Sequence, residues 1–244
     1  MEELYRKITG ARYCTAFTGA GVSTLSGIRD FRGKKGLYNY FDAEKIFDIG
    51  FFKKDPSFYY KASASLIYDI DEKKPSIVHC VLAELEKRGF LKALITQNID
   101  LLHERAGSSR VIEIHGSPKI HSCLRCSGVN MSFYEAAAIV QSGELPKCPK
   151  CGSVLKPEIT FFGESLPMDA LRQAVEEASK SDLMLVLGTS LVVYPAASMP
   201  QYTLANGGEI IIVNNEPTPL HDSAILTYDD LGTVFEKLND ILNG

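Results

Sequence analysis

Short apolar runs, each bounded by polar residues or glycine, recur along the chain and predict buried β-strands. The runs are rich in β-branched and aromatic residues, which favour strands. The predicted strands are Tyr13–Thr18, Ala93–Gln97, Val111–Ile114, Leu183–Gly188, Glu209–Asn214 and Ala224–Tyr228. Between them, apolar residues with helical spacing predict helices at Ser76–Arg88, Met168–Ser179 and Val234–Leu242. Alternating strands and helices indicate an α/β fold whose parallel sheet is covered by helices on both faces.

Most of the predicted strands end in a polar or glycine-containing cluster. The carboxyl ends of parallel strands share one edge of the sheet, and open α/β sheets bind their ligands there. The clusters, in chain order, are Gly19–Ser23, Gln97–Asp100, His115-Gly116, Gly188–Ser190 and Asn214–Glu216. We therefore expect the functional site at this edge.

Two stretches interrupt the alternation. Residues 34–75 are rich in aromatic residues and are predicted to be a helical insertion with a boundary at Asp55-Pro56. Residues 117–156 contain four of the six cysteines and are predicted to be a small inserted module. The remaining segments, 1–33, 76–116 and 157–244, would then form one discontinuous domain around the parallel sheet.

Composition narrows the class of protein. The 244 residues are 45% hydrophobic and 23% charged, as in ordinary globular domains, and the net charge of −4 gives no reason to expect nucleic acid or an anionic membrane as a partner. The N-terminus lacks the apolar segment of a signal peptide, and no apolar run reaches the ~18–20 residues of a membrane span. We expect a cytoplasmic protein whose cysteines are reduced.

Four cysteines form two C-x-x-C pairs that are separated by 21 residues. Each pair can direct two thiolates at one cation, and two pairs complete the tetrahedral site that zinc prefers. A redox role would require a thioredoxin-like context, which neither pair has. The predicted zinc ligands are Cys123, Cys126, Cys148 and Cys151. Such a closed site is structural, and we expect the other two cysteines, Cys14 and Cys80, to be buried small hydrophobic residues.

Several polar positions at the predicted edge have both a structural and a functional interpretation. The Gly19–Ser23 loop, G-x-G-x-S, is either a tight turn or a cradle for a pyrophosphate group. Asn98 and Asp100 are interpreted as helix N-caps, a role that also allows them to face the ligand. His115 ends a predicted strand at the edge and is a candidate general base. The other histidines are interpreted as structural or surface residues, with His121, beside the cysteines, a minor candidate for a metal ligand.

Taken together, these motifs resemble the sirtuin family of NAD-dependent protein deacylases. The resemblance extends from Thr18 to about Leu238, with every motif in the expected order. It is carried by Gly19–Ser23 with Gly27–Arg32, by Thr96–Asp100, His115-Gly116 and the four cysteines, and by Phe161–Glu164, Gly188–Ser190 and Val213-Asn214. One departure is Arg29, because the family usually has proline there, which would stiffen the loop.

The resemblance implies a Rossmann-like sheet beside a zinc module, with NAD bound between them. It assigns the pyrophosphate and nicotinamide side to Ala20, Gly21, Ser23 and Thr24, a loop over the cofactor to Asp30, Phe31 and Arg32, and the nicotinamide pocket to Asn98, Ile99 and Asp100. It assigns the ribose to Gln97, the adenosine end to Gly188, Thr189, Ser190, Asn214 and Asp230, and the substrate peptide to Phe162, Gly163, Glu164, Val193 and Tyr194.

The reaction that the resemblance implies needs no side-chain nucleophile. The substrate amide oxygen attacks the ribose carbon, nicotinamide leaves, and His115 then accepts a proton from a ribose hydroxyl. Asn98 and Asp100 would hold the carboxamide and a water. The expected substrates are acylated lysines in proteins, NAD is consumed, and zinc is structural. The alternatives are a mono-ADP-ribosyltransferase, an NAD-dependent dehydrogenase and an NAD-dependent binding protein.

The resemblance also bears on the acyl group. Sirtuins that prefer acidic acyl groups have a Tyr-x-x-Arg pair on a helix near the acyl pocket. Here Tyr59 pairs with Ala62, and Tyr60 with Ser63, so neither spacing supplies an arginine. We expect neutral acyl groups to be preferred over succinyl, because an unpaired carboxylate is costly to bury.

Overall fold

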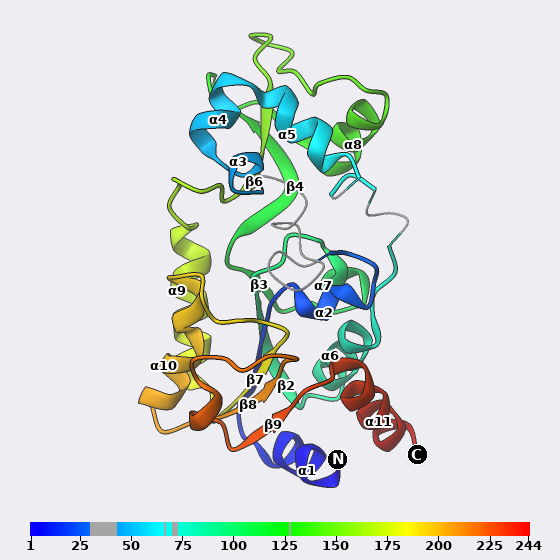
Figure 1. Cartoon of the computed structure of the whole chain (residues 1–244), viewed down its shortest axis with the longest axis vertical. Coiled ribbons are helices and arrows are strands. Elements are labelled where there is room, and N and C mark those ends of the chain that lie inside the picture. Colours follow the sequence, from blue (N-terminus) through cyan, green and yellow to red (C-terminus); the bar gives the residue numbers. More distant parts are fainter. Residues whose placement is uncertain (30–42, 66, 70–72, 127) are drawn as a thin grey trace. The chain divides into compact units, whose positions relative to one another are not determined.

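The structure is a computed structural model that describes residues 1–29, 43–65, 67–69, 73–126 and 128–244. These residues form two compact units (Figure 1). The first unit contains Met1–Arg29, Lys74–Ile114 and Met168–Gly244, and the second contains His115–Pro167 and the described residues of 30–73. Residues 115–116 and 157–167, expected with the parallel sheet, therefore belong to the second unit, together with the described residues of 43–73 and 117–156, while residues 74–75 of the first predicted insertion belong to the first unit.

A six-stranded parallel sheet is the centre of the first unit. The first strand of the chain lies in the middle of the sheet. The next two strands are added on one side of it and the last three on the other, which gives the order β3-β2-β1-β7-β8-β9. This is the order of Rossmann-type folds, whose ligands bind where the direction changes. The strands are β1 (Cys14–Thr18), β2 (Leu91–Thr96), β3 (Val111–Glu113), β7 (Leu183–Leu187), β8 (Glu209–Val213) and β9 (Leu226–Tyr228). All six predicted strands are confirmed, with slightly different ends.

Helices cover both faces of this sheet (Figure 1). The helices α1 (Glu2–Gly10), α6 (Ile77–Lys87) and α11 (Leu231–Asn243) contribute to one continuous core with the strands, while α9 (Met168–Lys180) packs with α10 (Met199–Ala205) on the other face. Two short helices, α2 (Gly21–Thr24) and α7 (Leu102–Arg105), follow β1 and β2. The single turns η3 (Ala196–Ser198) and η4 (His221–Ser223) lie in later loops. The helices predicted at Ser76–Arg88, Met168–Ser179 and Val234–Leu242 are confirmed.

One burial prediction is wrong. Cys14 is fully buried in β1 as expected, but Cys80 is exposed on α6. The buried positions of α6 include Val78 and Leu82, and Cys80 is two residues from each. Two residues on a helix correspond to roughly 200° of rotation, so Cys80 faces solvent.

The second unit has a three-stranded antiparallel sheet with the order β5-β4-β6. Its strands are β4 (Gly116–Cys123), β5 (Asn130–Ser132) and β6 (Leu155–Ile159), and its helices are α3 (Ala43–Ile46), α4 (Ile49–Lys54), α5 (Pro56–Ser63) and α8 (Phe133–Gln141). The boundary predicted at Asp55-Pro56 is confirmed, because Asp55 separates α4 from α5 and its carboxylate accepts from the Ser57 backbone N–H.

Aromatic side chains fill the core of the second unit. Phe52 packs edge to face with Tyr59 and with Phe161, which follows β6, and the Tyr59 and Phe161 rings are tilted against each other. Each of the three is less than 4% exposed, so the α4–α5 pair and the end of β6 are held by one apolar cluster.

Among the described residues, no helix is long and apolar enough to cross a membrane.

Candidate functional site

Three glycines bring the loops after β1 and β7 into direct backbone contact, where the strand order reverses. The N–H of Gly19 donates to Leu187 O at 3.0 Å, and that of Gly21 donates to Gly188 O at 2.9 Å. A Cβ atom on Gly21 would lie 2.6 Å from the Cα of Gly188, which itself has a φ of +59°. The G-x-G spacing is thus required by packing between the two loops, and it leaves bare backbone at this edge of the sheet.

A hydrogen-bonded triad of side chains lies beside these glycines. The Ser23 hydroxyl donates to Asp100 Oδ2 at 2.5 Å, and Asn98 Nδ2 donates to Ser23 Oγ at 3.2 Å and to Gly19 O at 3.1 Å. Burial raises the pKa of Asp100, and the hydrogen bonds from the Ser23 hydroxyl and the Leu102 N–H oppose that rise. The triad joins the loops after β1 and β2, as expected if the carboxyl ends of parallel strands share one edge of the sheet.

The helix-cap interpretation of Asp100 is correct in part. The N-cap position of α7 is Leu101, in a left-handed conformation, and Asp100 Oδ1 accepts from the N–H of Leu102 at 3.0 Å. One carboxylate oxygen of Asp100 therefore caps the start of α7, while the other accepts from the Ser23 hydroxyl. Asn98 contacts the β1 loop through its side chain and is not a cap. Ile99, between them, is half-buried.

A second pair connects β2 with the loop after β7. Gln97 Nε2 donates to Thr189 Oγ1 at 2.9 Å, and Thr189 Oγ1 also accepts from Leu191 N at 3.3 Å. Thr189 is buried, whereas Ser190 is exposed. The polar residues after three strands, β1, β2 and β7, are thus brought together at one edge of the sheet.

The remaining predicted residues of the first unit lie on its loops. Ala20 precedes α2, and Thr24 ends that helix with its hydroxyl on Gly21 O. Asn214 follows β8 directly. Val193 is half-buried and Tyr194 is exposed. Asp230 is the N-cap of α11, where its carboxylate accepts from Thr233 N at 2.6 Å, and this bond lowers its pKa.

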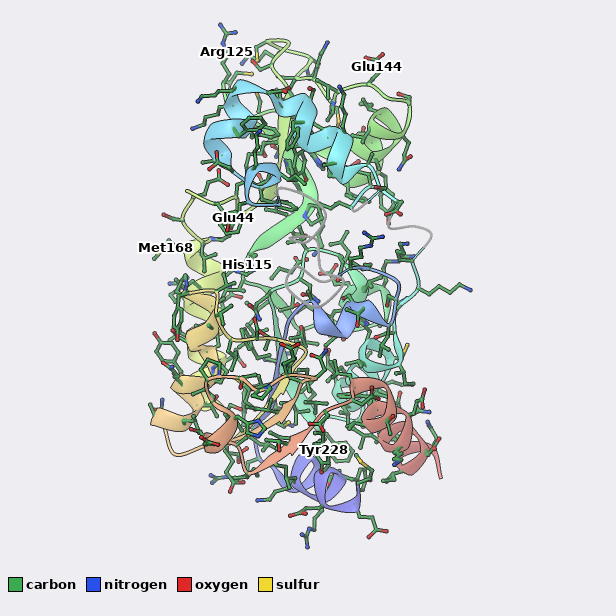
Figure 2. The ribbon with its side chains drawn as sticks, viewed as in Figure 1. Glu44, His115, Arg125, Glu144, Met168 and Tyr228 are labelled. Carbon is green, nitrogen blue, oxygen red and sulfur yellow. The ribbon has the colours of Figure 1, made fainter. Side chains whose placement is uncertain are left out.

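His115 and three of the predicted peptide-binding residues, Phe162, Gly163 and Glu164, belong to the second unit. His115 is half-buried and lies directly before β4 (Figure 2). Its carbonyl accepts from the N–H of Thr160 at 2.7 Å, so its main chain is fixed to the segment that follows β6. Phe162 lies on that segment with 45% of its surface exposed. Asp30, Phe31 and Arg32 lie outside the described residues.

The four predicted ligands form a cluster in the second unit that could hold one metal ion. The sulfur atoms of Cys123, Cys126, Cys148 and Cys151 all lie within 4.8 Å of one another. Neighbouring sulfurs are 3.3–3.5 Å apart, much farther than a disulfide bond and close to the separation of four thiolates around zinc, roughly 3.8 Å for Zn–S bonds of about 2.3 Å. The cysteines therefore fit zinc. His121 is not in this group, since its Nε2 lies 2.6 Å from the Tyr68 hydroxyl.

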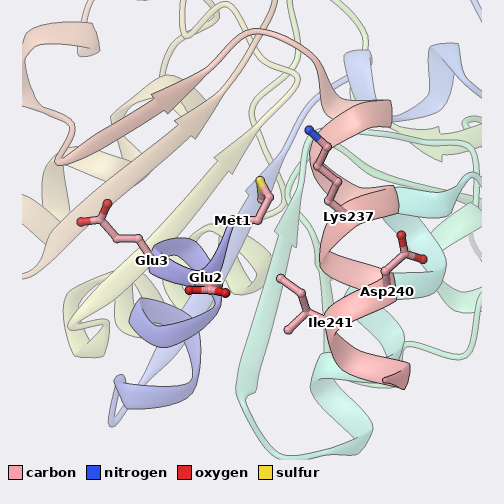
Figure 3. A pocket seen from close by; sticks show the side chains of 6 residues that line it. All are labelled: Met1, Glu2, Glu3, Lys237, Asp240 and Ile241. Atoms are coloured by element: carbon pink, nitrogen blue, oxygen red, sulfur yellow. The ribbon is translucent and has the colours of Figure 1, made fainter.

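The described residues also form a surface hollow of about 530 Å³ between α1 and α11 (Figure 3). Its lining consists of Met1, Glu2, Glu3, Lys237, Asp240 and Ile241. None of the predicted site residues lines this hollow.

Two buried interactions of polar residues could not be predicted from sequence. The first is the contact of His103 Nε2 with the Thr18 hydroxyl at 2.9 Å. The second is the ion pair of Lys156 with Glu164 in the second unit. A lysine directly after the buried Leu155 was the available signal for the second, because a buried lysine needs a partner.

The order of the parallel sheet and its glycine-lined loops define a Rossmann-type α/β protein, and the second unit adds a four-cysteine cluster that fits zinc. The chain belongs to the Sir2 family: the model of that family matches residues 19–195.

Relatives and solved structures agree with this membership. The chain is 44% identical to an NAD-dependent protein deacetylase of Thermotoga maritima, over 94% of this chain and 92% of the relative. It is 43% identical to NAD-dependent protein deacylase 1 of Archaeoglobus fulgidus, over 99% and 96%. A Sir2 structure with a propionylated peptide superposes with a TM-score of 0.89 at 40% identity, over 99% of this chain and 98% of that one. A Sir2 complex with a peptide and NAD⁺ gives 0.90 at 41%, with the same coverage.

Proposed function

We propose that this chain is an NAD-dependent protein lysine deacylase, which transfers the acyl group of a modified lysine to ADP-ribose and releases nicotinamide. The Ser23–Asn98–Asp100 triad is the observation that carries the proposal. The triad offers an amide donor, a hydroxyl and a buried carboxylate at the point where the strand order reverses. Membership of the Sir2 family and the names of the relatives support the same function.

The triad suits recognition of a carboxamide. Nicotinamide carries an NH₂ group that donates and a carbonyl that accepts. The Asp100 carboxylate would accept from the NH₂, while Asn98 would hold the carbonyl or a water. Ser23 orients both side chains through its hydrogen bonds.

The glycine loops suit the rest of the dinucleotide. Bare backbone at Gly21 and the start of α2 would receive the pyrophosphate, with Ala20 and Thr24 beside it. We assign the ribose to Gln97, which Thr189 holds in place. The adenosine end falls to the loops after β7, β8 and β9, through Gly188, Thr189, Ser190, Asn214 and Asp230.

His115 is proposed as the general base. NAD supplies the glycosidic bond that breaks and the ribose that receives the acyl group. The His115 imidazole accepts a proton from a ribose hydroxyl, so that this oxygen can attack the acyl carbon. The backbone bond from Thr160 fixes the main chain that carries the imidazole.

Zinc would be held by the four cysteines and would stabilise the second unit. The site has four thiolates and no open position for water, so the metal contributes to folding and not to the reaction.

The peptide would bind as an added strand on Phe162–Glu164 and on the Leu191–Pro195 stretch, a mode that tolerates different sequences. For the acyl group, Tyr59 and Ala62, and likewise Tyr60 and Ser63, are three residues apart on α5. Both tyrosines are at most 2% exposed, and Lys61 is on the exposed side of the helix. An acidic acyl group would therefore find no cation on this helix face.

Histidine variants test the proposal. We expect His115→Ala to bind NAD like the unmodified protein and to deacetylate a peptide at least ~10²-fold more slowly, the usual contribution of a general base. His221→Ala is the matched control, because His221 is exposed on η4. Full activity of the His115 variant, or equal losses in both variants, would contradict the assignment. A third variant, Asp100→Asn, should weaken NAD use and inhibition by nicotinamide together.

A further inference from the structure

Lys156 is a buried cation that neither the zinc site nor the catalytic residues require. It lies in β6, in the second unit, with 5% of its surface exposed. A buried ammonium group is costly unless it is paired and hydrogen-bonded. The groups around the Lys156 ammonium should therefore indicate the role of its charge.

All three donors of the ammonium have partners on the segment that follows Lys156. Nζ donates to Pro157 O at 3.1 Å and to Ile159 O at 2.8 Å, and it forms an ion pair with Glu164 Oε2 at 2.9 Å. It also lies 4.2 Å from the centroid of the Phe161 ring, in cation–π contact. Burial lowers the pKa of Lys156, and the Glu164 carboxylate opposes this shift.

These contacts close the segment 156–164 into a fixed turn. Glu164 Oε2, the oxygen that pairs with Lys156, also accepts from the N–H of Phe161 at 2.9 Å. The ion pair therefore holds both the start and the end of the turn. Glu164 is less buried than its partner, with 28% of its side chain exposed.

The turn fixes two features that the proposed reaction uses. Within it, the Thr160 N–H donates to His115 O at 2.7 Å. The Phe162 N–H donates to Phe47 O at 2.7 Å, and the Phe162 carbonyl accepts from the N–H of Ile49, the first residue of α4, at 3.1 Å. The backbone of the proposed general base and that of the proposed peptide-binding residues are thus attached to one turn.

We propose that Lys156 is a positioning residue, whose ammonium group holds the turn 156–164 so that Phe162–Glu164 can pair with the substrate peptide and the His115 main chain stays in place. The inference rests on the proposed deacylase function. Lys156 contacts no reacting atom in this proposal and acts through the turn. A neutral side chain at position 156 could not form the ion pair with Glu164.

The test compares Lys156→Met, Lys156→Arg and the control Lys53→Met. Lys53 is an exposed lysine on α4 in the same unit. The readouts are binding of a fluorescent acetyl-lysine peptide by anisotropy, binding of NAD by calorimetry, and kcat and KM for each substrate. Zinc content and the unfolding temperature show whether each variant is folded.

We expect Lys156→Met to weaken peptide binding and to raise the peptide KM by at least about tenfold, as is typical for loss of one partner in a buried, hydrogen-bonded charge pair. NAD binding should change by less than about twofold, Lys156→Arg should restore most of the peptide affinity, and Lys53→Met should behave like the unmodified protein. A purely structural role would lower stability and affect both substrates equally, and that result would overturn the proposal.

A double variant guards against misfolding of Lys156→Met. Glu164→Gln removes the carboxylate charge, and Lys156→Met/Glu164→Gln removes both charges. If the pair acts as a unit, the double variant should bind peptide no more weakly than the worse single variant. Additive losses would show that the two residues act separately and would contradict the proposal. Since peptide binding is measured directly, a chain that binds peptide but does not deacylate would contradict the proposed function and leave this test valid.

Discussion

Replacing Gly21 by alanine tests the backbone contact at the centre of the parallel sheet. The added Cβ would lie 2.6 Å, 2.9 Å and 3.0 Å from the Cα, O and C atoms of Gly188. All three are main-chain atoms of a residue that also donates its N–H to Val213 O, so none can rotate away. Ordinary contact at 3.4 Å or more would require the two loops to separate by several tenths of an ångström.

Such overpacking usually costs about 1–3 kcal/mol. For a chain of this size, each kcal/mol lowers the unfolding temperature by about 2–4 °C, so we expect a loss of roughly 2–12 °C. Because the same backbone is proposed to receive the pyrophosphate, NAD binding should also weaken by at least about tenfold, equivalent to about 1.4 kcal/mol.

Gly10→Ala is the matched control. Gly10 ends α1, and a Cβ there would meet no atom within 4 Å. Alanine in a helix is favoured over glycine by roughly 0.5–1 kcal/mol, so this variant should be slightly more stable and bind NAD normally. Thermal unfolding and calorimetry with NAD measure both effects. A Gly21→Ala protein with the stability and NAD affinity of the control would refute the close contact.

Three further predictions concern zinc, pH and the acyl group. Freshly purified protein should contain one zinc per chain, and Cys148→Ser should lose it and aggregate; metal-free, stable protein would contradict this. Burial lowers the pKa of His79 to about 4 from 6.5, so the unfolded chain binds the proton first and stability should fall by up to about 3 kcal/mol as the pH drops from 6.5 to 4. His79→Gln should reduce this dependence without abolishing it, because burial also lowers the pKa of His103 and of His121, and an unchanged slope would count against it. Succinyl-lysine should be used at least ~100-fold less efficiently than acetyl-lysine, equivalent to about 2.7 kcal/mol, and equal kcat/KM values would show that the acyl argument is wrong.

The sequence was most informative about the parallel sheet. Its strands are continuous apolar runs because both faces are buried, as in Leu183–Leu187, whose five residues are all buried. The polar clusters then follow at the strand ends, so the shared edge could be predicted without knowledge of the strand order. The pairing of Ser23 with Asp100, 77 residues apart, depends on β1 lying beside β2 and needed the structure.

The antiparallel sheet of the second unit was not predicted. Its central strand, Gly116–Cys123, mixes small, charged and apolar residues, and its buried positions do not alternate regularly because the register shifts between Ser117 and His121. Helix α1 was also missed: only Leu4 and Ile8 are buried, which is a weak periodic signal within a charged segment.

The roles of the site residues follow from local chemistry only in part. The four cysteines could be assigned from spacing, because zinc requires few ligands in a fixed geometry. The role of the G-x-G loop could not be assigned in this way. Its glycines are needed for contact with Gly188, which is far away in the sequence. The burial of Lys156 likewise depends on Glu164 and on a turn that no periodic pattern describes.

The central claim is that the chain moves an acyl group from lysine to ADP-ribose and breaks NAD in doing so. Mass spectrometry of the products formed from NAD and one acetyl-lysine peptide tests this claim directly. We predict equal amounts of deacetylated peptide, nicotinamide and O-acetyl-ADP-ribose, each lost in His115→Ala. NADH without free nicotinamide, or a peptide that gains ADP-ribose and keeps its acetyl group, would contradict the account.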